Sequence, residues 1–339
     1  MKRKNKPPNP LTAAILLLPA FLYRAGFIVF RLLTRSRKAD HPVVSIGNIA
    51  AGGTGKTPAV INLIELVKDR RNAAVLTRGY GRRTKGIHIA SADDRAADIG
   101  DEAVMIKRRY PSVNIVIGSD RLESARTAVG MGCDMLILDD GFQSFELKRD
   151  LDIVMIDSTF PLAGGMLLPA GRLREPMSSL KRADGIILHR YKLGRQDMLD
   201  GLKDRIRSIN PHIRIFHSNE EIDCFVSLET GRMEDSSYFA NKEIICFSGI
   251  GNPAGFYYLL NKSNAVIIDK IEKRDHYSWN EEDLASITKS VSASGASAVT
   301  TEKDAARIDI KLRDAWEMRI KIQIEQEEEF KDFINEKVF

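Results

Sequence analysis

One glycine-rich segment holds the residue types best suited to binding phosphate groups. It reads Gly-Asn-Ile-Ala-Ala-Gly-Gly-Thr-Gly-Lys-Thr-Pro from residue 47 to residue 58. Glycines allow backbone N–H groups to surround the β- and γ-phosphates of a nucleotide, while Lys56 can bridge their oxygens and the Thr57 hydroxyl can ligate Mg²⁺. The strict motif has glycine where Ala50 stands. We predict that the nucleotide binds Ala50, Ala51, Gly52, Gly53, Thr54, Gly55, Lys56 and Thr57.

Two adjacent carboxylates, Asp139 and Asp140, follow the apolar run Met135–Leu138. In phosphate-loop proteins, an apolar strand that ends in carboxylates holds Mg²⁺ or its water shell beside the loop. This signal is weak alone and strong after a phosphate loop. We therefore predict that Thr57, Asp139 and Asp140 hold the metal ion, and that Lys56 neutralises charge during phosphoryl transfer.

The elements that must position these residues alternate between short apolar runs and helical patterns. Buried strands are predicted at residues 43–46, 73–77, 114–117, 135–138, 153–156 and 185–188, with helices at 57–68 and 121–129. After a polar stretch at 192–218, a second set has strands at 244–247, 265–268 and 298–299 and helices at 253–260 and 281–290. Apolar strands spaced by helices predict a parallel sheet covered on both faces.

The predicted fold is therefore α/β. A domain of the P-loop NTPase type, with a mostly parallel sheet and helices on both faces, is expected over residues 39–215. A smaller C-terminal α/β domain is expected over residues 216–339. Residues 1–38 form a separate arm, which we expect to carry an amphipathic membrane helix.

The arm contains nine lysines and arginines and no acid, although the whole chain carries only +5. The rest of the chain is thus net negative, whereas a nucleic-acid binder more often spreads basic charge over a folded face. We expect no nucleic-acid partner and instead an anionic membrane surface. Three widely separated cysteines, in no metal-ligand spacing, argue against a disulfide scaffold or a zinc site and favour a reducing cytosol.

Within the arm, the stretch Leu11–Tyr23 is apolar apart from Thr12 and is shorter than the ~20 residues that span a bilayer. On a continuous helix, Arg24, Arg31, Arg35 and Lys38 would share one stripe. We expect a helix that lies in the membrane interface. A membrane-spanning helix reaching Phe30 and a core helix of the domain are alternatives. A cleaved signal peptide is disfavoured, since no small-residue cleavage site precedes a cysteine-paired body.

Two other classes of phosphate-loop protein lack their defining residues here. A guanine-specific GTPase needs Asn/Thr-Lys-x-Asp, which neither Asn241-Lys-Glu-Ile244 nor Thr301-Glu-Lys-Asp304 provides. Partition and metal-insertion ATPases carry a signature lysine where Ala51 stands, which argues against a switch ATPase without a small-molecule acceptor. A kinase for a soluble sugar would leave the basic arm unexplained.

Further segments resemble the tetraacyldisaccharide 4′-kinase family, in the order of the family and over nearly the whole chain. They are Leu76-Thr-Arg-Gly-Tyr-Gly-Arg82, Gly100-Asp-Glu102, Asp139-Asp-Gly-Phe-Gln143, Arg149-Asp-Leu-Asp-Ile153, Leu168-Pro-Ala-Gly171, Leu173-Arg-Glu-Pro176, Gly249-Ile-Gly-Asn-Pro253, Asp275-His276 and Thr300-Thr-Glu-Lys-Asp304. Two positions depart from the family: Ser144 stands where histidine is usual, and Ala103 where proline is usual.

The resemblance implies that the γ-phosphoryl group of ATP moves to the 4′-hydroxyl of a tetraacylated glucosamine disaccharide 1-phosphate. The reaction would take place at the cytoplasmic face of the bacterial inner membrane, with the chain bound peripherally or by a single N-terminal helix. The expected partners are this acylated lipid and the anionic membrane surface, without an obligatory protein partner.

The resemblance also implies roles for individual residues. Asp101 would act as the general base, with His276 as its partner. Without the resemblance, Asp101 would be interpreted as a helix N-cap and His276 as a surface histidine. Candidate substrate contacts are Asn48, Arg78, Gln143, Arg172, Arg174 and Glu175.

Overall fold

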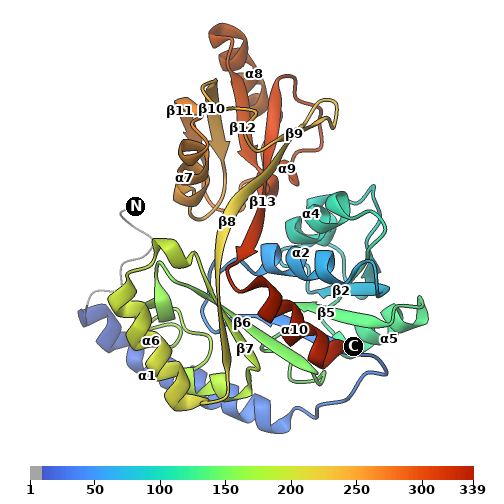
Figure 1. The fold of residues 1–339 in the computed structure, drawn as a ribbon, viewed down its shortest axis with the longest axis vertical. Coiled ribbons are helices and arrows are strands. Elements are labelled where there is room, and N and C mark those ends of the chain that lie inside the picture. Colours follow the sequence, from blue (N-terminus) through green and yellow to red (C-terminus); the bar gives the residue numbers. More distant parts are fainter. Residues whose placement is uncertain (1–9) are drawn as a thin grey trace.

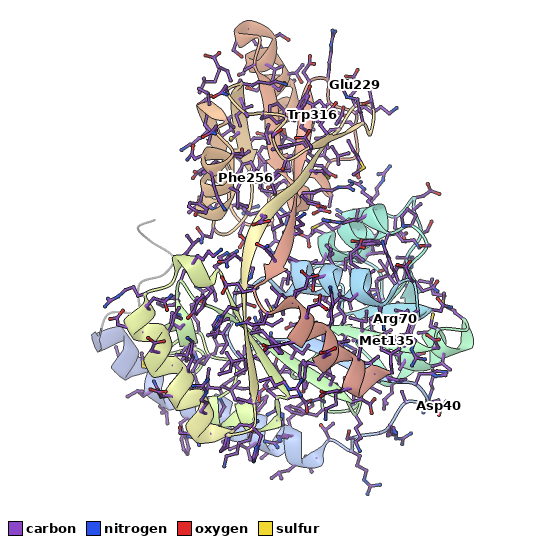
Figure 2. The ribbon with its side chains drawn as sticks, viewed as in Figure 1. Asp40, Arg70, Met135, Glu229, Phe256 and Trp316 are labelled. Carbon is purple, nitrogen blue, oxygen red and sulfur yellow. The ribbon has the colours of Figure 1, made fainter. Side chains whose placement is uncertain are left out.

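The computed structural model describes residues 10–339, which form two lobes connected by a pair of long strands (Figure 1). Lys2, Arg3, Lys4 and Lys6 of the basic arm lie outside the described residues. The core of each lobe lies between a central sheet and the helices that cover it. Met135 lies in the first lobe, whereas Phe256 and Trp316 lie in the second (Figure 2).

The first lobe is built on a mostly parallel sheet. Its strands are β1 (Val43–Gly47), β2 (Ala73–Thr77), β3 (His88–Ile89), β4 (Asn114–Ile117), β5 (Met135–Asp139), β6 (Leu151–Asp157), β7 (Gly185–His189) and the first part of β8 (Arg214–Ser227). They lie in the order β8-β7-β6-β1-β5-β2-β4-β3, and only β3 is antiparallel to its neighbour. The apolar runs form this sheet because both faces of each central strand are buried.

Helices cover both faces of this sheet. They are α2 (Lys56–Val67), α3 (Ala96–Ile99), α4 (Asp101–Arg109), α5 (Arg121–Gly130), α6 (Gln196–Ile209) and α10 (Glu327–Val338), with short 3-10 turns η1 (Pro161–Gly164), η2 (Met177–Arg182) and η3 (Tyr191–Leu193). Ile46 and Ile137 share a core with α2, α4 and α10. Val43 and Leu138 point the other way, into a core with α5.

The second lobe repeats this arrangement on a smaller scale. Its strands are β9 (Met233–Asp235), β10 (Glu243–Ser248), β11 (Val266–Glu272), β12 (Ser297–Thr301) and β13 (Ala315–Ile324), together with the second part of β8. Its helices are α7 (Ala254–Lys262), α8 (Glu281–Ser294) and α9 (Glu302–Ala305). Strands β11, β10, β12 and β13 are parallel, and α7 and α8 pack into separate cores.

Strand β8 belongs to both lobes. Its residues 214–218 pair with β7 of the first lobe, and its residues 218–227 pair antiparallel with β13. After β13 the chain returns to the first lobe, where Phe330 and Phe333 of α10 pack against Phe216. The division at residue 215 stays a prediction, and the structure adds that α10 contributes to the core of the first lobe.

The N-terminal helix α1 (Pro10–Leu33) ends earlier than the basic stripe requires. Thr34 donates its hydroxyl and its N–H to the carbonyl of Phe30, and Arg37 then pairs through its backbone with residues 146 and 148. Arg35 and Lys38 therefore lie beyond the helix. The prediction of a four-residue stripe is wrong, and only Arg24 and Arg31 are helical.

Helix α1 lies along the first lobe with one side docked. Ala20 is buried, the Phe27 ring meets Phe145 at 5.6 Å, and the Tyr23 hydroxyl donates to the Arg174 carbonyl at 3.1 Å. The opposite side is apolar and exposed, with Leu18, Phe21, Leu22, Val29 and Leu32 each 54–80% accessible. Within residues 10–339, no helix combines the length and apolarity needed to cross a bilayer.

Candidate active site

The phosphate loop connects β1 to α2 in a conformation that needs its glycines. Gly52 has φ 126° and Gly55 has φ 84°, values that residues with a side chain rarely adopt. A Cβ atom at Gly55 would meet the His189 ring at 2.5 Å. Helix α2 starts at Lys56 without a side-chain cap, so its first N–H groups can bind an anion. The predicted strand, loop and helix are thus all present.

The two carboxylates that follow β5 differ in their surroundings. Asp139 is only 5% exposed, and burial raises its pKa. Asp140, with φ 56°, lies 2.8 Å from Arg174 and 3.6 Å from the Lys56 ammonium. Burial also opposes ionisation of Asp140, but Lys56 and Arg174 outweigh it and lower its pKa. Lys56 therefore contacts a carboxylate at the position where it is expected to meet phosphate oxygens.

These residues offer hard oxygen ligands of the kind that Mg²⁺ prefers. Thr57 lies in the first turn of α2, and Asp139 is the last residue of β5, which pairs with β1. Among the described residues, no group of three His, Cys, Asp or Glu side chains forms a metal site of its own. A hydroxyl and one or two carboxylates, completed by phosphate oxygens and water, nevertheless fit Mg²⁺.

Four predicted substrate contacts form one network behind the loop. Arg174 donates to the Asn48 side chain at 2.9 Å, and Gln143 donates to the Asn48 carbonyl at 2.9 Å and to Glu175 at 2.7 Å. Glu175 is fully buried and pairs with Arg182. The Arg172 carbonyl accepts from the Ala51 N–H at 2.7 Å. In this structure these residues support the loop, and their contacts with substrate stay predictions.

Asp101 and His276 come together across the boundary between the lobes. Asp101 is the first residue of α4 and is 5% exposed, whereas His276 lies in the second lobe after β11 with a half-exposed side chain. The His276 Nδ1 atom is 3.3 Å from the Asp101 Oδ2 atom. His276 has φ 56°, an unfavourable value that its surroundings must maintain. The N-cap position belongs to Gly100, so the alternative role of Asp101 as N-cap is not observed.

Three more charged side chains, to which the sequence analysis assigned no role, take part in this contact. Arg307 binds the Asp101 Oδ2 atom through both Nε and Nη2, and Lys303 is 3.7 Å from the same oxygen. Lys303 also pairs with Glu102 at 3.0 Å. Burial raises the pKa of Asp101, but its hydrogen bonds and the charges of Lys303 and Arg307 hold that pKa well below its usual range. Burial and the bond to Asp101 raise the pKa of Glu102 to about 7.

Segments of the second lobe that carry the family resemblance meet around Asp304. Its carboxylate accepts from the Gly249 N–H at 2.9 Å and from the Trp279 indole at 3.2 Å. Thr301 caps α9 by accepting from the Asp304 N–H. On the first lobe, Tyr80 is 81% exposed and its ring centroid lies 6.2 Å from that of His276. Arg78, two residues earlier, is exposed just after β2.

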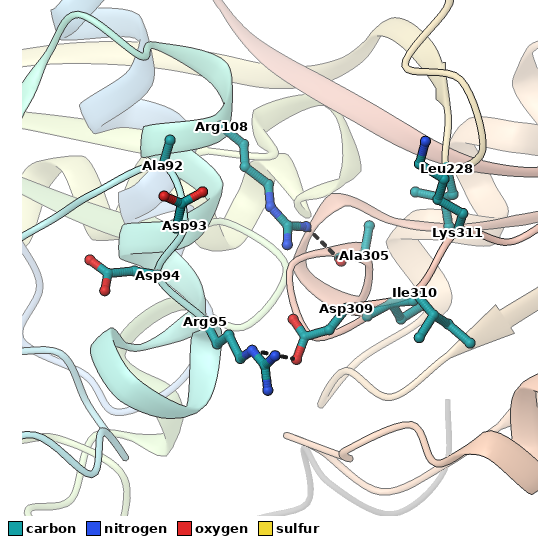
Figure 3. A pocket seen from close by; sticks show the side chains of 11 residues that line it. Ala92, Asp93, Asp94, Arg95, Arg108, Leu228, Ala305, Asp309, Ile310 and Lys311 are labelled. Carbon is teal, nitrogen blue, oxygen red and sulfur yellow. Dashed lines mark hydrogen bonds and ion pairs between the residues drawn. The ribbon is translucent and has the colours of Figure 1, made fainter.

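Two cavities lie beside these groups. One, of about 340 Å³, lies between the lobes and is lined by Arg95 and Arg108 of the first lobe and by Ala305 and Asp309 of the second (Figure 3). The other, of about 540 Å³, lies between α1 and the segment 162–177 and is mostly apolar, with Arg24 at its wall. None of the predicted site residues lines either cavity.

Comparisons with known proteins show which proteins this chain resembles. A family model described as tetraacyldisaccharide-1-P 4′-kinase matches residues 12–338. A tetraacyldisaccharide 4′-kinase of Syntrophus aciditrophicus (strain SB) is 38% identical over 90% of this chain and 86% of that protein. One of Anaeromyxobacter dehalogenans (strain 2CP-C) is 36% identical over 95% of this chain and 88% of that protein.

The fold agrees as well. The crystal structure of LpxK from Aquifex aeolicus in complex with ATP superposes with a TM-score of 0.78 and 26% identity, over 97% of this chain and 100% of that chain. These matches confirm the resemblance and the predicted α/β fold of the P-loop type. The chain belongs to the tetraacyldisaccharide 4′-kinase family and is a kinase.

Proposed function

We propose that this kinase transfers the γ-phosphoryl group of Mg-ATP to the 4′-hydroxyl of a tetraacylated glucosamine disaccharide 1-phosphate. The acceptor oxygen forms a bond to the γ-phosphorus while the bond from that phosphorus to the β,γ-bridging oxygen breaks, so that ADP leaves. The observation that supports the proposal most directly is the shared position of the phosphate loop, Asp139 and the Asp101–His276 pair. Burial raises the pKa of Asp139, whereas the charges of both Lys56 in the loop and Lys303, which lies 3.7 Å from Asp101, lower that pKa.

The nucleotide half of the site uses the residues around β1 and β5. Lys56 exchanges its contact with Asp140 for the β- and γ-phosphates and neutralises charge in the transition state. Thr57 and Asp139, with Asp140, would hold Mg²⁺, which would supply positive charge beside the phosphates. The phosphate loop supplies backbone N–H groups through the conformation that Gly52 and Gly55 permit.

Proton removal belongs to the Asp101–His276 pair, and the contacts favour a division of roles opposite to the predicted one. Asp101 is buried and bound by Arg307, and its low pKa makes it a poor proton acceptor. His276 is half-exposed, and its Nε2 atom lies on the other side of the ring from the Asp101 contact. In the proposed mechanism His276 accepts the proton of the 4′-hydroxyl, and Asp101 orients the ring.

The acyl chains and the membrane belong to the side of the molecule formed by α1. The apolar cavity between α1 and residues 162–177 can shelter hydrocarbon. The exposed apolar side of α1 supports insertion into the interface of the inner membrane at its cytoplasmic face. Arg24 lines the cavity and Arg31 lies over the Phe145 ring, so both basic residues lie toward the protein side of the helix.

The function is tested by incubating the full chain with ATP, Mg²⁺ and the tetraacylated disaccharide 1-phosphate in detergent micelles. Mass spectrometry should show one added phosphoryl group, and an acceptor that lacks the 4′-hydroxyl should gain none. ATP hydrolysis without a phosphorylated lipid would instead indicate a switch ATPase. Phosphorylation of the 4′-deoxy acceptor would show that the position is wrong.

A further inference from the structure

A single carboxylate oxygen, Asp101 Oδ2, receives cationic groups from several side chains of the second lobe. Arg307 approaches it through Nε at 3.0 Å and also through Nη2. His276 Nδ1 lies 3.3 Å away and Lys303 Nζ 3.7 Å away. The other oxygen, Oδ1, accepts from the Glu102 N–H at 3.1 Å. The imidazole therefore shares its carboxylate partner with a guanidinium.

Arg307 is held firmly in this position. Its side chain is 8% exposed, and its Nη1 atom donates to the Gly249 carbonyl at 3.1 Å. The same Nη1 atom lies 3.4 Å from Asp304, whose carboxylate is itself fixed by Gly249 and Trp279. Because so many contacts fix the guanidinium, its charge remains next to Asp101 and His276.

We propose that Arg307 is a positioning residue of the phosphoryl transfer, which fixes the Asp101 carboxylate and the orientation of the His276 imidazole before the reaction. The inference rests on the proposed function, because it assumes that His276 accepts the proton. Arg307 does not touch the reacting atoms in this role. It acts through Asp101 and through its direct contact with His276.

The contacts around His276 show what holds the ring. Asp101 lies 3.3 Å from Nδ1, and Asp275 lies 4.0 Å from Nε2. Arg307 Nη2 also lies 3.3 Å from Nδ1, on the same edge of the ring as Asp101. Removing the guanidinium should therefore change the orientation of the ring relative to Asp101.

The contact between Arg307 Nη2 and His276 Nδ1 has a second consequence. A guanidinium only donates hydrogen bonds, so at 3.3 Å this contact is a hydrogen bond only when Nδ1 carries no proton. The contact of Nδ1 with Asp101 instead requires a proton on Nδ1. The two contacts exclude each other, and only the second leaves the Nε2 lone pair free to accept a proton. Arg307 thus also influences which nitrogen carries the hydrogen.

Three variants of the full chain separate this role from simple support of the interface. Arg307→Gln removes the charge and keeps a hydrogen-bonding side chain, whereas Arg307→Lys keeps the charge. Arg108→Gln is the matched control, since Arg108 also bridges the lobes by donating to the Ala305 carbonyl at 2.9 Å but contacts neither Asp101 nor His276. Two measurements are made: kcat together with the KM for ATP, and the tautomer of the His276 ring from NMR of ¹⁵N-histidine-labelled protein.

We expect Arg307→Gln to lower kcat by about tenfold or more with little change in the KM for ATP, and to change the ¹⁵N signals of the His276 ring. Arg307→Lys should recover most of the lost kcat, and Arg108→Gln should leave both measurements unchanged. Wild-type kcat and unchanged ring signals in Arg307→Gln, or equal losses of kcat in all three variants, would overturn the inference.

The proposed function fails under a different result. If His276→Gln retains wild-type kcat on the acylated acceptor, His276 is not the base, whatever the Arg307 variants do. If His276→Gln loses activity and Arg307→Gln keeps wild-type kcat and unchanged His276 ring signals, only the role of Arg307 is refuted. Where Arg307→Gln does not fold, thermal unfolding reveals it, and Arg307→Met with the same two measurements replaces it.

Discussion

At the scale of single residues, the phosphate loop provides a contrast between two neighbouring glycines. Gly55 has φ 84° and faces the His189 ring, whereas Gly53 has no atom within 4 Å of an added Cβ and no positive φ. We expect Gly55→Ala to lower the free energy of unfolding without nucleotide by roughly 1–3 kcal/mol, because it strains the backbone. Gly53→Ala should change it by less than about 0.5 kcal/mol. Urea unfolding of both variants measures the difference, and equal effects would contradict the observed loop.

The Asp101–His276 pair makes its own prediction. His276→Gln should lower kcat by about 10²–10⁴-fold with little change in the KM for ATP, as expected for loss of a proton acceptor. Asp101→Asn should lower kcat less, because it removes the group that orients the ring and leaves the proton acceptor in place.

A second His–Asp pair in the first lobe serves as the control for these variants. His88 lies 2.8 Å from Asp94, away from the loop, so His88→Gln should keep wild-type kcat. The double variant at residues 101 and 276 should be less than additively worse than either single variant. Fully additive losses would show that the two residues act separately.

Residues of the phosphate loop could be predicted from sequence because their contacts are local. The loop, its strand and its helix occupy adjacent positions, and the glycines reveal the backbone conformation. Arg307 could not be predicted in this way, because its partner Asp101 lies 206 residues earlier. Arg307 follows the Thr300–Asp304 motif by three positions, but its sequence context is the same as that of a solvent-exposed arginine. Only the packing of one lobe on the other identifies it.

At the scale of elements, α10 gives a test of which lobe it stabilises. Phe330 is 3% exposed and meets Phe216 of the first lobe at 5.1 Å, so Phe330→Ala should cost roughly 3–5 kcal/mol of stability. Phe339, at the end of the chain, is 50% exposed and provides the control. Both tryptophans, Trp279 and Trp316, lie in the second lobe, so their fluorescence reports that lobe alone.

In Phe330→Ala, loss of ATP binding at a denaturant concentration where the tryptophan fluorescence is still native would place α10 in the first lobe. Simultaneous loss of both signals would show that the lobes unfold as one unit. Loss of the tryptophan signal first would contradict the assignment of α10 to the first lobe.

The helices were predictable where their apolar spacing matches a covered face, and α1 shows the limit. The basic residues at 31, 35 and 38 continue a helical spacing, but the chain leaves the helix after Leu33. Backbone bonds of Arg37 to residues 146 and 148 compensate for ending the helix. Those partners are distant in sequence, so tertiary pairing overrode the local pattern.

At the scale of the whole molecule, the orientation of α1 changes what membrane binding should depend on. Phe21 and Leu32 are 66% and 80% exposed on the side away from the protein. Replacing both with serine should weaken binding to neutral phosphatidylcholine vesicles, by roughly 1.5–3 kcal/mol for each side chain that no longer enters hydrocarbon. Met233→Ser, an exposed apolar residue of the second lobe, is the control.

Electrostatic attraction should contribute only part of the free energy of membrane binding. Arg35→Gln with Lys38→Gln should reduce the salt-sensitive component on anionic vesicles, because attraction to anionic lipid is screened within about 8 Å at physiological salt. Vesicle sedimentation across a salt series separates the two contributions. Unchanged binding of the serine variant would contradict insertion of the apolar side.

The arrangement of the lobes was the least predictable level. Two α/β sets in succession were visible in the alternation of strands and helices. That a single 14-residue strand would join both sheets was not, because the polar stretch before it resembles a boundary. The packing of α10 on the first lobe could not be predicted either, because the sequence of a short amphipathic helix does not show which sheet it covers.

The pair β8 and β13 has a mechanical consequence. The chain passes from one lobe to the other along β8 and comes back along β13, so a two-stranded ribbon forms the covalent connection between them. Such a ribbon keeps its length through its hydrogen bonds but twists readily, because two-stranded ribbons have the largest and most variable twist. We therefore expect the lobes to move by torsion about the ribbon axis. Torsion would swing His276 past Asp101 on an arc, so the alignment of a proton acceptor is set by one angle of the sheet.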